Sequence, residues 1–436
     1  MPFGIQGKDT MKILTIVSGV IASLIFSVGA GQALTPVEQL GKSIFFDTNL
    51  SINGNQSCAT CHDPTVGWTG PLSSINAAGT VYEGSIPGRF GNRKPPSSAY
   101  ATQSPILFPD KKGSFTGGNF WDGRATGERL GNPASDQARG PFLNPVEQAA
   151  PDNACIVWKV CVAGYPVAFD NVWGAGACAI TWPADVAAAC ATEGGYVTLS
   201  DADLVKVEQN YDSIALSIAA FESSPESNAF SSKYDAYQAG LADLTKMEKQ
   251  GLNLFNGKAK CSKCHSLKGD SKGHALFTDY TYDNLGIPRN PDNPWYSQAT
   301  FNPLGIDWVD FGLGGFLESR LDFQLYAAMN LGAQKVPTLR NVDKRPNLGF
   351  VKAYGHNGYF KSLKGIVHFY NTRDAKPVCA DPFTTEASAL AQGCWPVPEV
   401  TLNVNTKELG DLKLSSEEED AIVAFMKTLN DGYIVP

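Results

Sequence analysis

Histidine is scarce in this chain, with five in 436 residues, and methionine is equally rare. No run of basic residues stands out and the net charge is −8, so nothing indicates a nucleic-acid partner. Beyond the N-terminal region no apolar run is long enough to cross a bilayer. With 43% hydrophobic and 18% charged residues, the composition is that of a folded chain large enough for two or three domains.

The one long apolar run lies near the N-terminus, from Ile13 to about Val28. A lysine precedes it and small residues follow it up to Ala33, a pattern typical of a cleaved secretory signal. We therefore expect 1–33 to be a signal peptide, with 1–10 as an upstream extension. The mature protein is expected in the periplasm, without membrane contact. An uncleaved anchor is the alternative, but the run is short for a span.

The pentad Cys-x-x-Cys-His occurs twice, as Cys58-Ala-Thr-Cys61-His62 and as Cys261-Ser-Lys-Cys264-His265. It is the attachment signal of c-type haem, in which two thiols bond the porphyrin and the histidine ligates iron. A structural zinc site would place its cysteine pairs close in sequence, and a thioredoxin-like motif needs a βαβ setting. We predict two covalently bound haem c groups.

Similar segments precede the two pentads, TPVEQLGKSIFF from Thr35 and TKMEKQGLNLFN from Thr245. Each has a glutamate three residues after the threonine, the signature of a capping box that begins a helix. We predict a mainly α protein with long irregular loops and two cytochrome c-like domains, 34–235 and 236–436. Apolar periodicity predicts further helices at 204–223 and 415–430.

Six cysteines lie outside the pentads, an even number that predicts disulfides in an exported chain. Four of them fall in 149–200, which interrupts the repeat and is interpreted as a disulfide-rich insertion: Cys155, Cys161, Cys178 and Cys190. Their three pairings stay open, while Cys379 and Cys394 are expected to close a separate loop. The three tryptophans of the insertion fit either a small stapled core or a partner-docking surface.

The distribution of histidines indicates that the first haem iron is open on one face. No histidine lies between His62 and His265, whereas an electron-transfer cytochrome usually fills both axial positions. An open iron suits peroxide cleavage, which needs a group that transfers protons. Glu147, ten residues after Gln137, is a candidate. By spacing alone, a surface glutamate after a proline turn is the favoured interpretation.

Eight segments together resemble the bacterial di-haem cytochrome c peroxidases and their MauG-like and MbnH-like relatives. The resemblance covers nearly all of the chain after the signal, except 149–200. The segments are SCATCH, FWDGRA, DQARGPFLNPVEQ, CSKCH, FTDYTYDNLGIP, KVPTLRN, AYGHNGYF and IVHFYNTRD. The resemblance implies a periplasmic oxidoreductase that uses hydrogen peroxide.

The same resemblance assigns roles around the first haem. His62 is similar to the proximal ligand of the peroxidatic haem. Gln137, Pro141 and Glu147 match its distal pocket, with Glu147 as the acid–base group. Trp121 matches a tryptophan that relays electrons between the haems, although it also fits an ordinary core aromatic.

For the second haem, the resemblance implies His265 as proximal ligand and Tyr370 as distal ligand, fourteen residues after His356. Tyrosine in place of methionine is a feature of the MauG-like branch, and a phenolate lowers the iron potential relative to methionine. His368 is the competing ligand. For His356 we expect a buried hydrogen-bonding role and for His274 a structural one.

One absence also points to the MauG-like branch, and two departures from the family pattern limit these implications. Common peroxidases carry a loop histidine that blocks the resting first haem, and 63–110 contains none, so this haem should be open without reduction. Ala259 stands where MauG-like members have a surface tryptophan. The calcium site between the haems matches poorly, with Asn92 as its candidate ligand.

We expect the protein, as a monomer or homodimer, to oxidise a small redox protein or a side chain of a partner protein with peroxide. One alternative is an ordinary cytochrome c peroxidase that removes peroxide with electrons from a small cytochrome or cupredoxin. The alternative from another class is a non-catalytic di-haem electron-transfer cytochrome.

Overall fold

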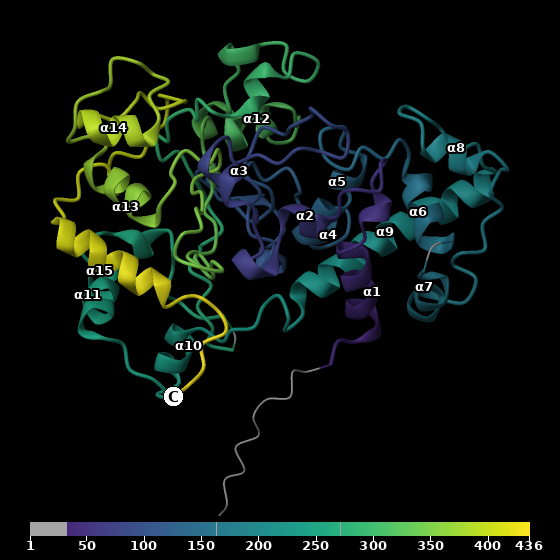
Figure 1. Cartoon of the computed structure of the whole chain (residues 1–436), viewed down its shortest axis with the longest axis horizontal. Helices are drawn as coiled ribbons and strands as arrows, with labels where there is room; N and C mark the ends of the chain where they lie inside the picture. Colours follow the sequence, from purple (N-terminus) through teal and green to yellow (C-terminus); the bar gives the residue numbers. More distant parts are fainter. Residues whose placement is uncertain (1–32, 163, 271) are drawn as a thin grey trace, which may run out of the picture. The chain divides into compact units, whose positions relative to one another are not determined.

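Helices make up most of the regular structure (Figure 1). The computed structural model describes residues 33–162, 164–270 and 272–436. The predicted signal peptide therefore lies outside the described residues, apart from Ala33. In chain order the helices are α1 (Pro36–Phe45), α2 (Cys58–Cys61), α3 (Ser73–Ala77), α4 (Pro133–Ala138), α5 (Gly140–Leu143), α6 (Asn153–Val162), α7 (Pro166–Trp173), α8 (Val186–Cys190), α9 (Asp201–Ser223), α10 (Lys233–Gln238), α11 (Lys246–Asn256), α12 (Gly312–Glu318), α13 (Leu363–Thr372), α14 (Glu386–Gln392) and α15 (Ser416–Lys427).

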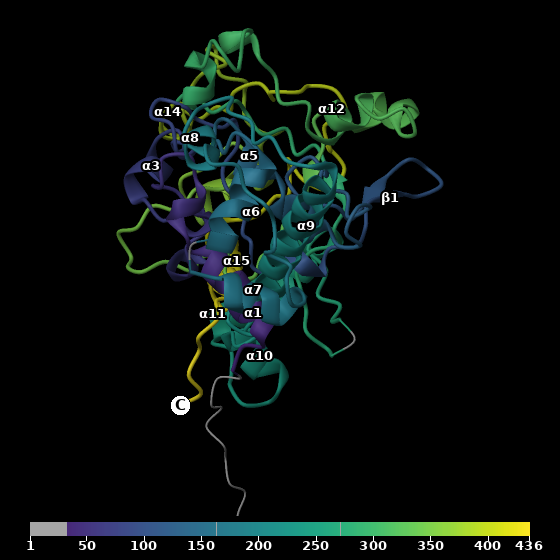
Figure 2. The same ribbon diagram turned by 90° about the vertical axis from the view of Figure 1, so that its right-hand side faces the viewer.

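Strands are short and form two antiparallel pairs. In the first pair β1 (Phe108–Pro109) lies against β2 (Phe115–Thr116), and in the second β3 (Tyr282–Asp283) lies against β4 (Gln334–Lys335). A small apolar cluster that includes Leu107, Phe115 and Leu313 joins the first pair to α12. Figure 2 shows β1 and α12 on the same side of the ribbon. The prediction of a mainly α fold is thus confirmed.

The two predicted capping boxes begin α1 and α11. Thr35 Oγ1 accepts a hydrogen bond from the Glu38 amide (3.4 Å), and the Glu38 carboxylate accepts one from the Thr35 amide (2.7 Å). Thr245 and Glu248 repeat the arrangement at α11, with 3.2 and 2.7 Å. Because each box satisfies amides that have no partner within the helix, both helices begin where the sequence predicts.

Each of these helices crosses a longer partner at a glycine. Where α1 packs on α9, a Cβ added to Gly41 would collide with the backbone oxygen of Ser217. Where α11 packs on α15, a Cβ added to Gly251 would collide with the oxygen of Ala421. The absence of a side chain therefore allows backbone-to-backbone contact at both crossings.

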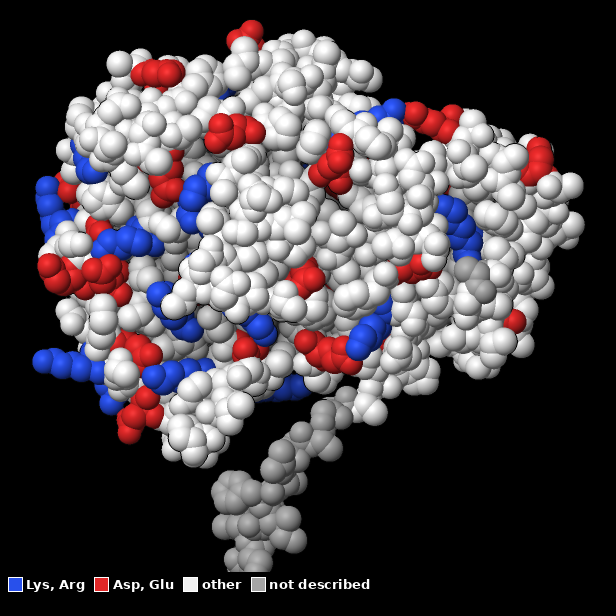
Figure 3. Space-filling model, in the orientation of Figure 1, with Lys and Arg blue, Asp and Glu red and all other residues white. Residues whose placement is uncertain are grey.

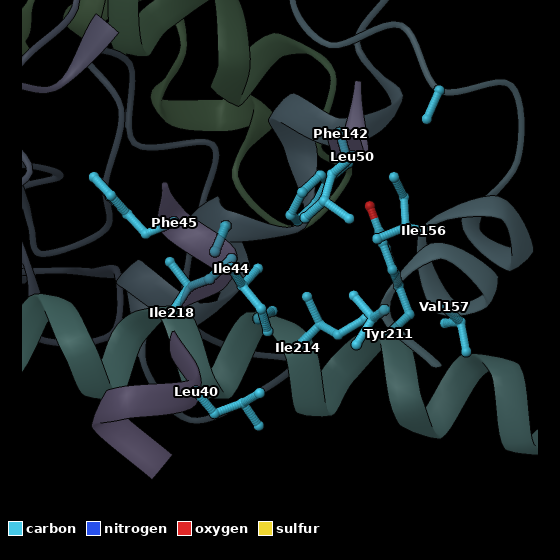
Figure 4. Close-up of a cluster of buried hydrophobic side chains, with 14 of the residues drawn as sticks. Leu40, Ile44, Phe45, Leu50, Phe142, Ile156, Val157, Tyr211, Ile214 and Ile218 are labelled. Atoms are coloured by element: carbon cyan, nitrogen blue, oxygen red, sulfur yellow. The ribbon is translucent and has the colours of Figure 1, made fainter. Parts of the chain in front are cut away.

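Two large hydrophobic clusters lie beside these crossings. The first combines α1, α6 and α9 with Phe142 of α5, as Figure 4 shows for Leu40, Ile44 and Ile214. The second combines α11, α13 and α15, with Phe255 and Phe425 fully buried. The domain boundary near residue 235 stays a prediction.

The six cysteines outside the pentads form three disulfides. Cys379 pairs with Cys394, as expected. In the 149–200 segment the pairs are Cys155–Cys190 and Cys161–Cys178, one of the three pairings left open. These bonds tie α6 to α8 and to the loop that follows α7, and α6 packs on α9. Whether the segment is an insertion stays a prediction.

Acidic and basic side chains alternate over the face seen in Figure 3. In the part of the chain that the structure describes, no single helix is long and apolar enough to cross a membrane. By length and composition, α6 and α7 are long and apolar enough for a membrane span only when taken together, and a bend of 107° separates them.

We predict that Gly41→Ala and Gly251→Ala each lower the free energy of unfolding by about 1–3 kcal/mol, because the added methyl forces the helices apart. In a helix without such a contact the same change would stabilise by about 1 kcal/mol, so the sign is diagnostic. The measurement is chemical denaturation of the holoprotein. Gly164→Ala is the control, since a Cβ there meets nothing within 4 Å. Equal effects at all three positions would contradict the crossing argument.

Candidate functional site

Two cavities contain the predicted site residues. The first, here called the His62 cavity, is lined by Cys58 and Cys61 of α2, by His62, and by Gln137, Pro141 and Glu147. The second, the His265 cavity, is lined by Cys261, Cys264, His265 and Tyr370. Residues far apart in sequence thus converge on each pentad as the resemblance implies.

A backbone carbonyl orients each pentad histidine. His62 Nδ1 lies 3.2 Å from the oxygen of Trp68, and His265 Nδ1 lies 2.9 Å from the oxygen of Phe277. With Nδ1–H as donor, the lone pair of Nε2 is free for a metal. Burial lowers the pKa of His62 to about 4 and also lowers that of His265, which keeps both rings neutral, as metal ligation requires.

The donor set of both cavities fits covalently attached haem. The four pentad thiols are the cysteines outside disulfides, and two line each cavity. Among the described residues, Tyr280 Oη and Trp295 Nε1 of the His62 cavity are buried without a hydrogen-bond partner, as are both ring nitrogens of His356 in the His265 cavity. A bound group with polar substituents would supply the missing partners.

Glu147 reaches the His62 cavity from the loop after α5. The Asn144 amide donates to Glu147 Oε1 at 3.1 Å and so orients the carboxyl group. Burial raises the pKa of Glu147, and the nearby charge of Arg124 opposes this rise. A carboxyl group with a raised pKa is suited to exchange protons near neutral pH. The surface alternative for Glu147 does not fit this position.

The sequence interpretation missed several polar residues of the His62 cavity, and three of them are Arg124, Asn144 and Glu222. Arg124 and Asn144 line it and act on Glu147, and both lie in segments already quoted for the resemblance. Glu222, near the end of α9, is only 4% exposed and lines the same cavity, where burial raises its pKa to about 8. An acidic residue in the apolar stretch AAFES was the signal that could have revealed it.

Trp121 lines both cavities. Its indole N–H donates to the backbone oxygen of Lys94 at 2.9 Å, and the side chain is 8% exposed. Its ring lies edge-on to that of His356, with centroids 6.4 Å apart. Trp121 therefore belongs to the wall that separates the cavities, together with Lys94 and Lys335.

Tyr370 and His368 lie on α13 and point in different directions, because residues two apart on a helix do not share a face. Tyr370 lines the His265 cavity, and burial raises the pKa of its phenol. His368 Nδ1 instead lies 2.9 Å from Glu419 Oε1 of α15. His368 is absent from the cavity lining, so its geometry does not support the competing role.

The other two histidines and the calcium candidate occupy separate places. His356 is buried, with Nε2 3.8 Å from Asp310 and 3.7 Å from Glu399. His274 stacks on Phe230, with ring centroids 4.1 Å apart. Asn92 lines the His62 cavity, and its backbone oxygen accepts a hydrogen bond from Asn293. A calcium site at Asn92 stays a prediction.

Comparison with known proteins agrees with these motifs. Residues 36–243 match the family model described as di-haem cytochrome c peroxidase. The chain is 32% identical to the methylamine utilization protein MauG of Paracoccus denitrificans, over 95% of each chain. It is 24% identical to the cytochrome-c peroxidase IdrP1 of Denitromonas iodatirespirans, over 90% of this chain and 80% of the relative.

A solved structure gives the same result for the fold. The crystal structure of the diheme peroxidase BthA from Burkholderia thailandensis is similar with a TM-score of 0.67. The two chains are 27% identical, and the match covers 92% of this chain and 87% of the other.

We predict that the double variants Cys58→Ala/Cys61→Ala and Cys261→Ala/Cys264→Ala each lose one of two covalently bound haems, because each pentad supplies the thiols of one cavity. The intact mass of the denatured protein, with haem staining, reports the number that remains. Cys379→Ala/Cys394→Ala serves as the control and should keep both groups. Two retained haems in either pentad variant would contradict the assignment.

Proposed function

Since the chain belongs to the di-haem cytochrome c peroxidase family, we propose that this oxidoreductase uses hydrogen peroxide in the His62 cavity to oxidise a partner. One observation carries the proposal. The described lining of this cavity combines His62 with Glu147 and Gln137, and it includes no other histidine and no methionine. A substrate-accepting iron needs such a free position, whereas an electron-transfer cytochrome would have both positions filled.

Haem bound at the two pentads would supply iron that takes up peroxide and stores oxidising equivalents. Glu147 would transfer a proton between the two oxygens of peroxide. Asn144 occupies Oε1, so Oε2 accepts the proton of one peroxide oxygen and returns it to the other, which leaves as water. The Gln137 amide would orient peroxide and Pro141 would add an apolar wall, because both residues line the cavity. Trp121 would carry electrons between the cavities.

Tyr370 is proposed as the second ligand of the His265 haem. Its position in the cavity lining supports this role, as does the engagement of His368 by Glu419. A phenolate ligand stabilises oxidised iron. This feature, with the similarity to MauG, favours oxidation of a partner protein or redox protein in the periplasm.

A second candidate function is peroxide removal with electrons from a small cytochrome or cupredoxin. The observation in its favour is Ala259, which is 3% exposed and replaces the surface tryptophan expected from the resemblance. The similarity to a cytochrome-c peroxidase is compatible with this role. The chemistry in the His62 cavity is the same for both functions.

We predict that Glu147→Gln lowers the rate of the first reaction with peroxide by roughly 10²–10⁴-fold, the usual contribution of general acid–base catalysis. In the wild type the rate should rise with pH as Glu147 loses its proton. The midpoint should lie above the ordinary carboxyl range, since burial raises this pKa. Stopped-flow absorbance of the haem measures both effects.

The matched control is Glu193→Gln, at an exposed carboxylate paired with Arg89, which should keep the wild-type rate and pH profile. A Glu147→Gln protein with an unchanged rate would remove Glu147 from the mechanism.

For haem ligation we expect the oxidised wild type to show one high-spin and one low-spin ferric signal of equal intensity by EPR. Tyr370→Phe should change the low-spin signal alone, because only the His265 haem loses a ligand. His368→Gln, two residues away, should leave both signals unchanged. Two low-spin signals in the wild type would mean that the His62 haem is blocked, and the proposed open site would fail.

A further inference from the structure

Trp295 connects the His62 cavity to the segment 294–308, which has no role in the proposed mechanism. It lies in the short 3₁₀ helix η5 (Pro294–Ser297) and lines the cavity. Asn293 accepts a hydrogen bond from the Trp295 amide (3.0 Å) and donates one to the backbone oxygen of Asn92 (2.9 Å), another lining residue. Trp295 is therefore anchored to the cavity wall.

A second indole continues from Trp295 toward the surface. The Trp308 ring lies edge-on to the Trp295 ring, with centroids 5.9 Å apart and planes at 72°. Trp308 follows the 3₁₀ helix η6 (Gly305–Asp307), which packs on η5. The Asn302 side chain donates to the backbone oxygens of Trp295 (3.1 Å) and Gly305 (2.8 Å). These two hydrogen bonds hold the two turns together and so fix the position of one indole ring against the other.

The outer end of this pair is accessible. Trp308 is partly exposed, and its neighbours Leu304 and Ile306 are 61% and 46% exposed. Neither Trp295 nor Trp308 belongs to the three hydrophobic clusters of the described residues. A role in core packing therefore explains the pair poorly.

We propose that Trp295 and Trp308 form an electron relay between the His62 cavity and the surface, so that a one-electron donor is oxidised at Trp308 without entering the cavity. This inference rests on the proposed use of peroxide. Indole is one of the side chains most readily oxidised by one electron, and transfer between rings in contact is fast compared with transfer across the whole wall. The protein thus positions the carriers while the bound cofactor supplies the redox chemistry.

The electrons balance for one peroxide. Its O–O bond breaks as it takes two electrons and two protons, and two waters form. Trp295 first gives an electron to the cavity, and Trp308 then reduces the oxidised Trp295. The outside donor finally reduces the oxidised Trp308. Both indoles are restored after each transfer, and two donor molecules are each oxidised by one electron.

Trp121 does not provide this connection. It lies in the wall between the two cavities and is 8% exposed, so it links the cavities to each other. The relay through Trp295 and Trp308 instead gives the His62 cavity its own route outward.

The test treats the di-haem protein with hydrogen peroxide in the absence of a donor and maps oxidised tryptophans by peptide mass spectrometry. In the wild type we expect oxidation at Trp308 well above that at Trp182, which is also partly exposed but lines neither cavity. Trp295→Phe should lower oxidation of Trp308 several-fold, and Trp295→Tyr should restore it. Phenylalanine and tyrosine pack alike, but only tyrosine is readily oxidised by one electron.

A rapid-freeze EPR sample with ring-deuterated tryptophan gives a second measurement, in which Trp308→Phe should reduce the tryptophan radical signal and Trp182→Phe should not. Equal oxidation of Trp308 in the wild type and in Trp295→Phe would overturn the relay. The haem absorbance in the same samples distinguishes a failure of the proposed function from a failure of the relay alone. A wild type that does not react with peroxide overturns the proposed function, whereas a normal reaction with unchanged Trp308 oxidation overturns only the relay.

Discussion

The close crossing of two helix pairs determines where both cavities form. At Gly41 and at Gly251 one backbone touches another, since any larger residue would collide. Four residues later on the same helices, Phe45 and Phe255 form part of the wall of the His62 and His265 cavities. Each helix then leads through a short loop into its pentad. Backbone contact at the glycine thus fixes the position of the helix pair whose phenylalanine lines the cavity beside it.

Both cavities lie beside a crossed helix pair, but different elements form the rest of each cavity wall. The His62 cavity receives α4 and the loop after α5, which bring the polar groups of Gln137 and Glu147 to its lining. The His265 cavity receives one face of α13, which contributes the phenol of Tyr370. In the proposed function, the Glu147 carboxyl group would serve the reaction with peroxide, and the Tyr370 oxygen, once bound to iron, would favour storage of oxidising equivalents.

The wall between the cavities and the turns beside them contain indole and ammonium groups. Trp121, Lys94 and Lys335 line both cavities, so any electron exchange between the bound groups passes close to them. Trp295 and Trp308 extend the aromatic contacts outward from one cavity. The three tasks that we propose would thus lie at separate places in the fold: proton transfer at Glu147, electron exchange across Trp121, and contact with a donor at Trp308.

Local signals in the sequence determined the capped helices α1 and α11, the pentads and the even set of disulfide cysteines, because each depends on residues a few positions apart. The family resemblance led to Glu147 and Tyr370. Spacing could not replace it, since spacing alone favoured a surface role for Glu147. Only the tertiary structure decided the pairing of the four clustered cysteines, the direction of His368 and the place of Glu222 and Trp295 in the His62 cavity. These depend on contacts between segments far apart in the chain, where small differences in packing direct a side chain into a cavity or away from it, and no local pattern encodes them.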